Sequence, residues 1–91
     1  MKRTQQGPTV GIIGGGQLAR MLALAGLPMG VQFRVHDPAA DACAGQVVAL
    51  SQGHFDDTAA LATFAEGLEV VTFDFENVPA ASVAALAAKV P

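Results

Sequence analysis

Short apolar runs alternate along this chain with longer stretches in which apolar residues recur every three or four positions. Four of the runs have the length of buried strands and cover residues 10–13, 31–35, 47–50 and 70–73. The stretches between and after them have the periodicity of amphipathic helices. This alternation predicts an α/β fold, in which a parallel sheet carries helices on both faces.

Four helices are expected, and most of them show a start signal or an apolar face. The apolar faces consist of Leu18, Met21, Leu22 and Ala25 in the first helix, of Leu61, Phe64, Ala65 and Leu68 in the third, and of Val83, Leu86 and Ala87 in the last. A short second helix is expected after Asp37, whose carboxylate would cap it, with Pro38 at the first helical position. The third helix starts at Asp56 or Asp57, and Pro79 opens the last one.

Composition and charge narrow the class of protein. The chain has 91 residues, enough for one small domain, of which 52% are hydrophobic and 14% charged. The net charge of −3 disfavours nucleic acid as a partner. No apolar run has the length of a signal peptide or a membrane span. The single cysteine cannot form an internal disulfide, which fits a reducing cytoplasm. Residues 1–8 are expected to form a polar tail and residues 9–91 one domain. Because the chain stops where another strand would be expected, we interpret it as a fragment of a longer protein.

The stretch GIIGGGQLAR, residues 11–20, carries the first candidate site. Three glycines follow the first strand, so the backbone can turn tightly and approach a ligand with no Cβ in the way. The amides of the next helix turn favour an anion or another acceptor. Gly14, Gly16 and Ala19 also match the looser dinucleotide-binding fingerprint, and Asp37 lies about twenty residues further on. Two other interpretations stay open. The glycines would then serve only close packing of strand and helix, and a helix cap is favoured over ribose binding for Asp37.

The stretch FDFENVP follows the fourth strand and carries the second candidate site. Asp74 and Glu76 point to the same side if the strand alternation continues, and Asn77 adds an amide. Ligands of parallel sheets sit beyond the carboxyl ends of the strands, so this segment and the glycine loop are expected to face one crevice. A ligand contact is favoured for Glu76, with ribose hydroxyls or an amine as donors, whereas Asn77 is as well explained by capping the next helix. The role of Asp74 stays open.

Two longer motifs carry a resemblance to a known family. GIIGGGQLARMLALA, followed by VVTFDFENVP, closely resembles the start of the 5-(carboxyamino)imidazole ribonucleotide synthases, the ATPase subunits of phosphoribosylaminoimidazole carboxylase. The resemblance runs from Thr9 to the end of the chain. It departs from the family at Ala19, where glycine is usual, and at Asp74, where glutamate is common. It implies a Rossmann-like domain that precedes an ATP-grasp module and binds no dinucleotide.

The resemblance also implies a reaction. It is that of an ATP-dependent carbon–nitrogen ligase of purine biosynthesis, which carboxylates aminoimidazole ribonucleotide with bicarbonate through a carboxyphosphate intermediate. The implied ribonucleotide-binding residues are Gly15, Gly16, Gln17 and Leu18 on the glycine loop, and Glu76 and Asn77 after the fourth strand. ATP and magnesium would bind to the ATP-grasp module outside this chain. The chain alone is then expected to hold no catalytic, cofactor-binding or metal-binding residue and to be inactive.

The residue types in this chain also indicate that the ATP-dependent chemistry takes place outside it. The five lysines and arginines form no cluster near the expected crevice, and there is no Gly-Lys-Ser/Thr phosphate loop. Two other classes of function stay open. An NAD(P)-binding domain of an oxidoreductase would use the glycine loop and Asp37, and a regulatory or interaction module would carry no chemistry. A homodimer is left open, and Arg20 is not assigned a role.

Overall fold

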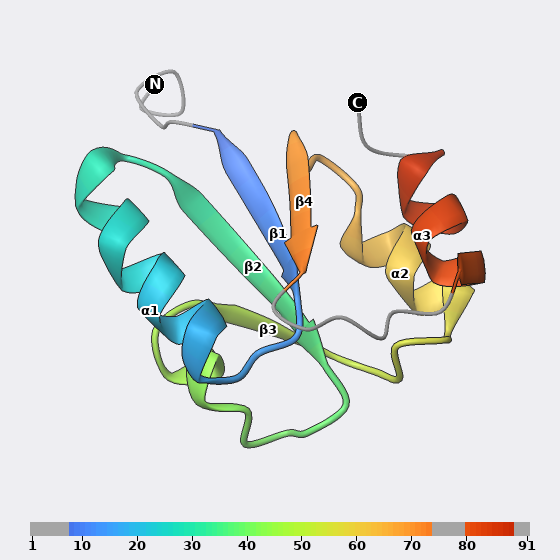
Figure 1. Cartoon of the computed structure of the whole chain (residues 1–91), viewed down its shortest axis with the longest axis horizontal. Helices are drawn as coiled ribbons and strands as arrows, with labels where there is room; N and C mark the ends of the chain where they lie inside the picture. The colour runs from blue at the N-terminus through green and yellow to red at the C-terminus, as the bar shows by residue number, and fades with distance from the viewer. Residues whose placement is uncertain (1–7, 74–79, 89–91) are drawn as a thin grey trace.

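The computed structural model describes residues 8–73 and 80–88. Within these residues the chain forms one sheet of four parallel strands with helices between and after them (Figure 1). The elements in chain order are β1 (Thr9–Ile13), α1 (Gln17–Gly26), the 3₁₀ helix η2 (Leu27–Met29), β2 (Gln32–Asp37), the 3₁₀ helix η3 (Cys43–Gln46), β3 (Ala49–Gln52), α2 (Thr58–Phe64), β4 (Val70–Phe73) and α3 (Ala80–Ala87). The strand order is β3-β2-β1-β4, so β1 has a neighbour on each side.

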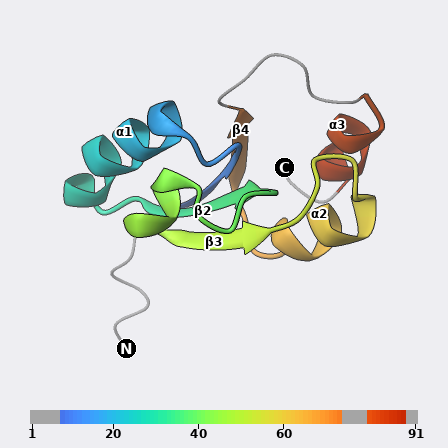
Figure 2. The same ribbon diagram turned by 90° about the horizontal axis from the view of Figure 1, so that it is seen from below.

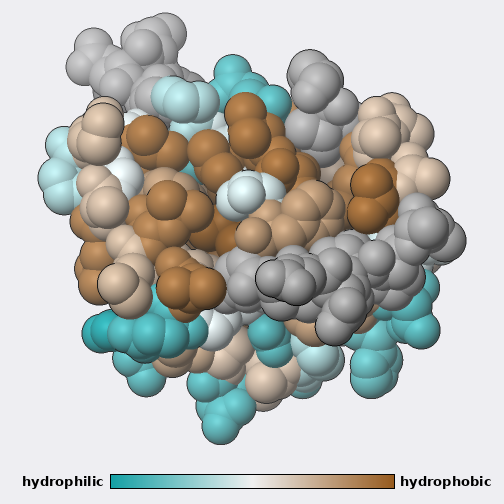
Figure 3. All heavy atoms as spheres, viewed as in Figure 1, coloured by the Kyte–Doolittle hydropathy of each residue, from teal (hydrophilic) through white to brown (hydrophobic). Residues whose placement is uncertain are grey.

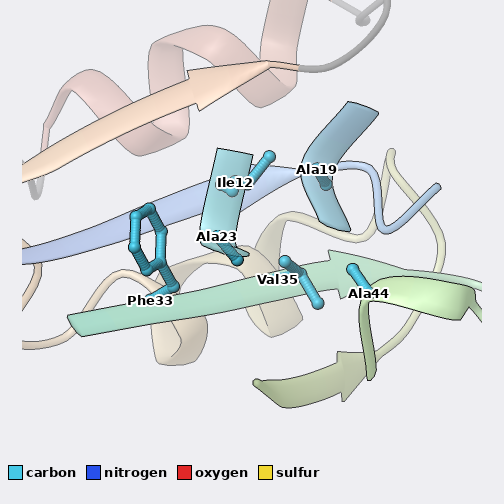
Figure 4. Close-up of a cluster of buried hydrophobic side chains, with 6 residues drawn as sticks. All are labelled: Ile12, Ala19, Ala23, Phe33, Val35 and Ala44. Carbon is cyan, nitrogen blue, oxygen red and sulfur yellow. The ribbon is translucent and has the colours of Figure 1, made fainter. Parts of the chain in front are cut away.

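Each face of the sheet is covered by helix. In the ribbon, α1 lies on one side of the sheet and α2 and α3 on the other (Figure 2). Ile12 belongs to the buried cluster that includes residues of α1, Ile13 belongs to the one that includes residues of α2 and α3, and both are fully buried. The cluster on the α1 side consists of Ile12, Ala19, Ala23, Phe33, Val35 and Ala44 (Figure 4). The cluster on the other side consists of Ile13, Leu61, Phe64, Ala65, Leu68 and Leu86. The expected α/β fold, with a parallel sheet between helices, is confirmed.

The buried face of α1 differs from the predicted one. The helix packs on the sheet through Ala19, Ala23 and Gly26. The face predicted to be buried is exposed and consists of Leu18, Met21, Leu22 and Ala25. Small residues are needed because the helix lies close to the strands: a Cβ added to Gly26 would lie 2.4 Å from Cζ of Phe33. The larger side chains therefore form an apolar surface over α1, which continues towards β4 (Figure 3).

The segment after β2 is not the α-helix that the sequence predicts. Asp37 is the last residue of β2, residues 38–42 form a loop, and only Cys43–Gln46 turn as the 3₁₀ helix η3. The prediction of a helix cap at Asp37 is therefore wrong. Its carboxylate binds the amide of Gly15 in the glycine loop, as well as that of Ala39, and so has a long-range partner that no local pattern shows.

The strands begin and end close to the predicted positions. β4 has the predicted bounds, and β1 extends the predicted run by one residue, Thr9. β3 is shifted two residues towards the C-terminus, because the amides of Val47 and Val48 donate to the carbonyl of Ala44 and so extend the preceding turn. Val47 and Val48 thus belong to the turn after η3 rather than to the strand, and Val48 packs against the cluster on the α1 side.

α2 begins where the sequence predicts. Asp57 is its N-cap, and the Oδ1 atom accepts a hydrogen bond from the amide of Ala60 at 3.0 Å. Leu61 and Phe64 are buried, as predicted. The rest of the predicted face is buried too, although Leu68 lies beyond the end of the helix, in the turn that leads to β4.

α3 is anchored differently from the prediction. Pro79, which was expected to open it, lies outside the described residues. Leu86 is buried, but Val83 is 42% exposed, so the predicted face is only partly correct. The buried polar residue is Ser82, whose hydroxyl donates to the carbonyl of Phe55 at 2.5 Å and ties the helix to the loop before α2. None of the helices formed by residues 8–73 and 80–88 has the length and apolar character needed to cross a membrane.

Candidate functional site

The carboxyl ends of β1, β2 and β4 meet at one edge of the sheet. Ile13, the last residue of β1, pairs with His36 of β2 on one side and with Phe73 of β4 on the other. The glycine loop and Asp37 therefore leave the sheet beside the end of β4. This confirms that strands one and four are neighbours. Asp74, Glu76 and Asn77 lie outside the described residues, so their positions stay a prediction.

The glycine loop, residues 14–16, leaves β1 through a conformation that favours glycine. Gly14 has a φ of +105°, which L side chains rarely adopt. Its amide donates to the carbonyl of His36 at 2.8 Å, which ties the loop to the end of β2. The turn brings the chain back along the sheet as α1.

Gly15 is enclosed by the chain. Its amide donates to Oδ2 of Asp37 at 2.8 Å, and its carbonyl accepts from the amide of Ala44 at 2.9 Å. A Cβ at this position would lie 3.1 Å from Cβ of Ala42 and 3.3 Å from Cβ of Asp37. The predicted close approach of backbone is thus observed, but the groups that approach Gly15 here belong to the protein itself.

The first turn of α1 is the part of the loop region that faces outwards. Gly16 is the N-cap and supplies no side-chain bond, while Gln17 and Leu18 are exposed. Amides in the first turn of a helix have no acceptor within the helix and carry the positive end of its dipole. Gln17 is held by a weak contact, in which the thiol of Cys43 donates to Oε1 at 3.7 Å. Gln17 and Leu18 therefore stand where a polar or anionic ligand would meet the loop.

His36 has a structural role. It is fully buried between Phe55 and Phe64, and both ring nitrogens have partners. Nε2 lies 3.2 Å from the carbonyl of His54, so Nε2 carries the proton and donates it. Nδ1 then accepts from the hydroxyl of Ser51 at 2.9 Å. His36 is thus a buried core residue whose two ring nitrogens are both hydrogen-bonded within the chain.

Arg20, to which the sequence assigns no role, and Asp37, whose predicted role is a helix cap, both lie near the loop. Arg20 is half-buried, and its Nε atom makes no hydrogen bond with the described part of the chain. Asp37 bonds two backbone amides, those of Gly15 and Ala39. The sequence signal for the contact with Gly15 is the acidic residue about twenty positions after a glycine loop, although that signal is usually interpreted as ribose binding.

Comparison with known sequences and structures decides the family. A sequence model for the ribonucleotide synthetase preATP-grasp domain matches residues 8–91. The chain belongs to this family. The preATP-grasp domain is thus the Rossmann-like unit that the two sequence motifs indicate, and the resemblance on which that expectation rests is confirmed.

Several relatives of this preATP-grasp domain are named as N5-carboxyaminoimidazole ribonucleotide synthases or synthetases. The N5-carboxyaminoimidazole ribonucleotide synthase of Pseudomonas aeruginosa is 49% identical over 82 residues, which are 90% of this chain and 23% of that protein. The crystal structure of the Thermus thermophilus synthetase matches with a TM-score of 0.85 and 56% identity, over 90% of this chain and 23% of the other. The Aspergillus clavatus synthase, in complex with ADP and 5-aminoimidazole ribonucleotide, matches with a TM-score of 0.81 and 31% identity, over 94% and 23%. The preATP-grasp domain thus spans under a quarter of the length of these relatives.

Proposed function

We propose that this preATP-grasp domain is the substrate-binding N-terminal part of an ATP-dependent ligase that carboxylates aminoimidazole ribonucleotide with bicarbonate in purine biosynthesis. The observation that carries the proposal is that the glycine loop and the end of β4 leave the same edge of the sheet, where Ile13 pairs with Phe73. The relatives are named as synthases of this kind, and one is described with 5-aminoimidazole ribonucleotide bound. Ribonucleotide held between these two segments would lie at the usual ligand position of a parallel sheet.

The ribonucleotide is contacted from both segments in this proposal. The binding residues are Gly15, Gly16, Gln17 and Leu18 on one side and Glu76 and Asn77 on the other. Because the amide of Gly15 is already bonded to Asp37, Gly15 serves through its lack of a side chain. The amides at the start of α1 and the side chain of Gln17 supply donors, and Glu76 accepts from hydroxyls or from the amine.

ATP and magnesium are bound outside this chain in the proposed enzyme, on an ATP-grasp module of the same longer polypeptide. A triphosphate needs cationic side chains around it. Arg34 is engaged elsewhere, since its Nη2 donates to the carbonyl of Glu66 at 2.6 Å and its guanidinium lies 5.9 Å from the ring centre of Phe64. The residues of this chain bind and orient the ribonucleotide, and the enzyme acts in the cytoplasm without a nucleic-acid or membrane partner.

The proposal predicts that the isolated chain is catalytically silent. Purified chain, mixed with ATP, magnesium, bicarbonate and aminoimidazole ribonucleotide, should release no phosphate above the rate without the ribonucleotide. Phosphate release that depends on the ribonucleotide would contradict the assignment of the chemistry to a separate module.

A substitution at Glu76 tests the site in the longer enzyme. Glu76→Ala should raise KM for aminoimidazole ribonucleotide about ten- to a hundred-fold, because removing one partner of a hydrogen bond in a binding site costs about 1–3 kcal/mol. KM for ATP should change little. The matched control is Glu66→Ala, which removes an exposed carboxylate before β4, away from the carboxyl edge. Equal weakening of ATP and ribonucleotide, or loss of folding, would make Glu76 a structural residue.

NAD(P) binding is the alternative to which the glycine fingerprint points. It needs the carboxylate at the end of β2 to bind ribose hydroxyls, but both oxygens of Asp37 accept backbone amides. We therefore expect no NAD or NADP binding by this chain. Calorimetric titration that shows micromolar affinity for NAD would favour the oxidoreductase instead.

A further inference from the structure

We infer that Asp37 is a positioning residue for the glycine loop, whose carboxylate holds Gly15 so that the first turn of α1 is presented to a mononucleotide. The identity of that ligand rests on the proposed function, whereas the hold on the loop rests on the geometry of this chain. Asp37 lies at the position where dinucleotide-binding domains have the acidic residue that binds the ribose hydroxyls. In this chain its carboxylate binds the backbone instead.

Both oxygens of the Asp37 carboxylate are engaged by amides from different loops. Oδ2 accepts from Gly15 at 2.8 Å, and Oδ1 accepts from Ala39 at 2.9 Å. Hydrogen bonds to a charged acceptor are about twice as strong as those between neutral groups. The carboxylate thus joins the loop after β1 to the loop after β2.

The chain that follows Asp37 encloses the glycine loop from a second side. The amide of Ala44 in η3 donates to the carbonyl of Gly15 at 2.9 Å. The thiol of the preceding residue, Cys43, donates to Oε1 of Gln17 at the start of α1. Gly15 is thus bonded through both its amide and its carbonyl, and Ala42 leaves little room for a side chain there.

This enclosure has a consequence for ligand class. In a dinucleotide site, the acidic residue after the second strand reaches outwards to the ribose of the second nucleoside. Here the same residue type faces inwards to the backbone, and the loop of residues 38–42 leads into η3, which contacts α1. Within the described part of the glycine loop and the first turn of α1, Gln17 and Leu18 are the exposed residues, which suits one sugar or phosphate group rather than two nucleosides.

The hold on the loop is tested on the chain as it stands by amide hydrogen exchange. Asp37→Ala removes both acceptors, Asp37→Asn keeps one, and Asp41→Ala removes a like charge from an exposed residue of the same loop. The Gly15 amide should exchange about tenfold faster or more in Asp37→Ala, with Asp37→Asn between it and the unsubstituted chain. Amides of β1 should keep their protection. If the Gly15 amide exchanges no faster in Asp37→Ala than in Asp41→Ala, the inference is overturned.

Titration of the same variants with aminoimidazole ribonucleotide tests the effect on the ligand. Kd should rise about tenfold in Asp37→Ala, less in Asp37→Asn, and not in Asp41→Ala. If the unsubstituted chain binds and Asp37→Ala binds equally well, Asp37 does not position the loop for its ligand and the inference is overturned. If the unsubstituted chain does not bind, the proposed function fails, and Gly15 exchange alone decides whether Asp37 holds the loop.

Discussion

At the scale of single residues, Gly14 has the largest positive φ in the described part of the chain. Its φ of +105° turns the chain out of β1, and the same turn lets its amide reach the carbonyl of His36. A side chain at this φ strains the backbone in any surroundings. The path of the glycine loop therefore depends on this one position before any packing is considered.

Replacing Gly14 with alanine should lower the free energy of unfolding by about 1–3 kcal/mol, because the substitution forces an L side chain into a sparsely populated conformation. Urea unfolding measures the change. Gly30→Ala is the comparison, since Gly30 has a φ of +89° but a Cβ there would meet open space, so that it reports the backbone penalty alone. An unchanged midpoint for Gly14→Ala would contradict the described path of the loop.

The sequence shows part of this site and hides the rest. Three glycines between an apolar run and a helix pattern predict a tight turn at Gly14, and the structure confirms it. The bond from Gly15 to Asp37 spans 22 positions, so it depends on β1 and β2 lying side by side. A local pattern such as Asp-Pro competes with that long-range contact, and in this chain the local interpretation as a helix cap is wrong.

At the scale of elements, α1 shows why apolar periodicity predicts a helix better than it predicts the buried face. Leucine and methionine recur at helical spacing, yet Ala19, Ala23 and Gly26 face the strands. Close packing selects small residues there, and their low hydrophobicity hides them from a pattern based on large side chains. On α2 the prediction is correct, because Leu61 and Phe64 are large and buried.

The start of α2 gives a test of local capping. Asp57→Ala should lower the free energy of unfolding by about 1 kcal/mol, because the hydrogen bond from the Ala60 amide to the Asp57 carboxylate is lost at the helix N-terminus. Asp57→Asn should retain most of the stability. Asp56→Ala is the matched control, since it removes an adjacent exposed carboxylate outside the cap. Thermal unfolding followed by circular dichroism compares the three, and equal losses at positions 56 and 57 would argue against the cap.

At the scale of the whole molecule, the outer face of α1 is unusually apolar. Leu18, Met21 and Leu22 are 64%, 54% and 45% exposed. Figure 3 shows a brown surface over α1 that extends towards β4. Contiguous apolar surface of this kind favours association in water. We therefore expect the isolated chain to associate at high concentration.

The double substitution Met21→Glu and Leu22→Gln tests that expectation. It should reduce self-association in sedimentation velocity experiments at matched concentration while leaving the unfolding midpoint nearly unchanged, because both side chains are about half exposed. Met29→Gln, which alters a residue that is 79% exposed outside α1, serves as control. A large loss of stability in the double variant would show that these side chains are covered in the folded chain.

The position of β1 between β2 and β4 has a consequence for how the chain folds during its synthesis. On a ribosome β1 emerges before the other strands, whereas the strand that closes its second edge, from Val70 to Phe73, is made only after β2, β3 and α2. Parallel neighbours cannot join through a hairpin, so that edge waits for long-range pairing, which is slow. Until then Ile12 and Ile13 sit on a strand open to foreign partners. Ribosome-bound chains that end before Val70 should therefore bind a chaperone. Chains that extend beyond the end of β4 should dissociate from the chaperone.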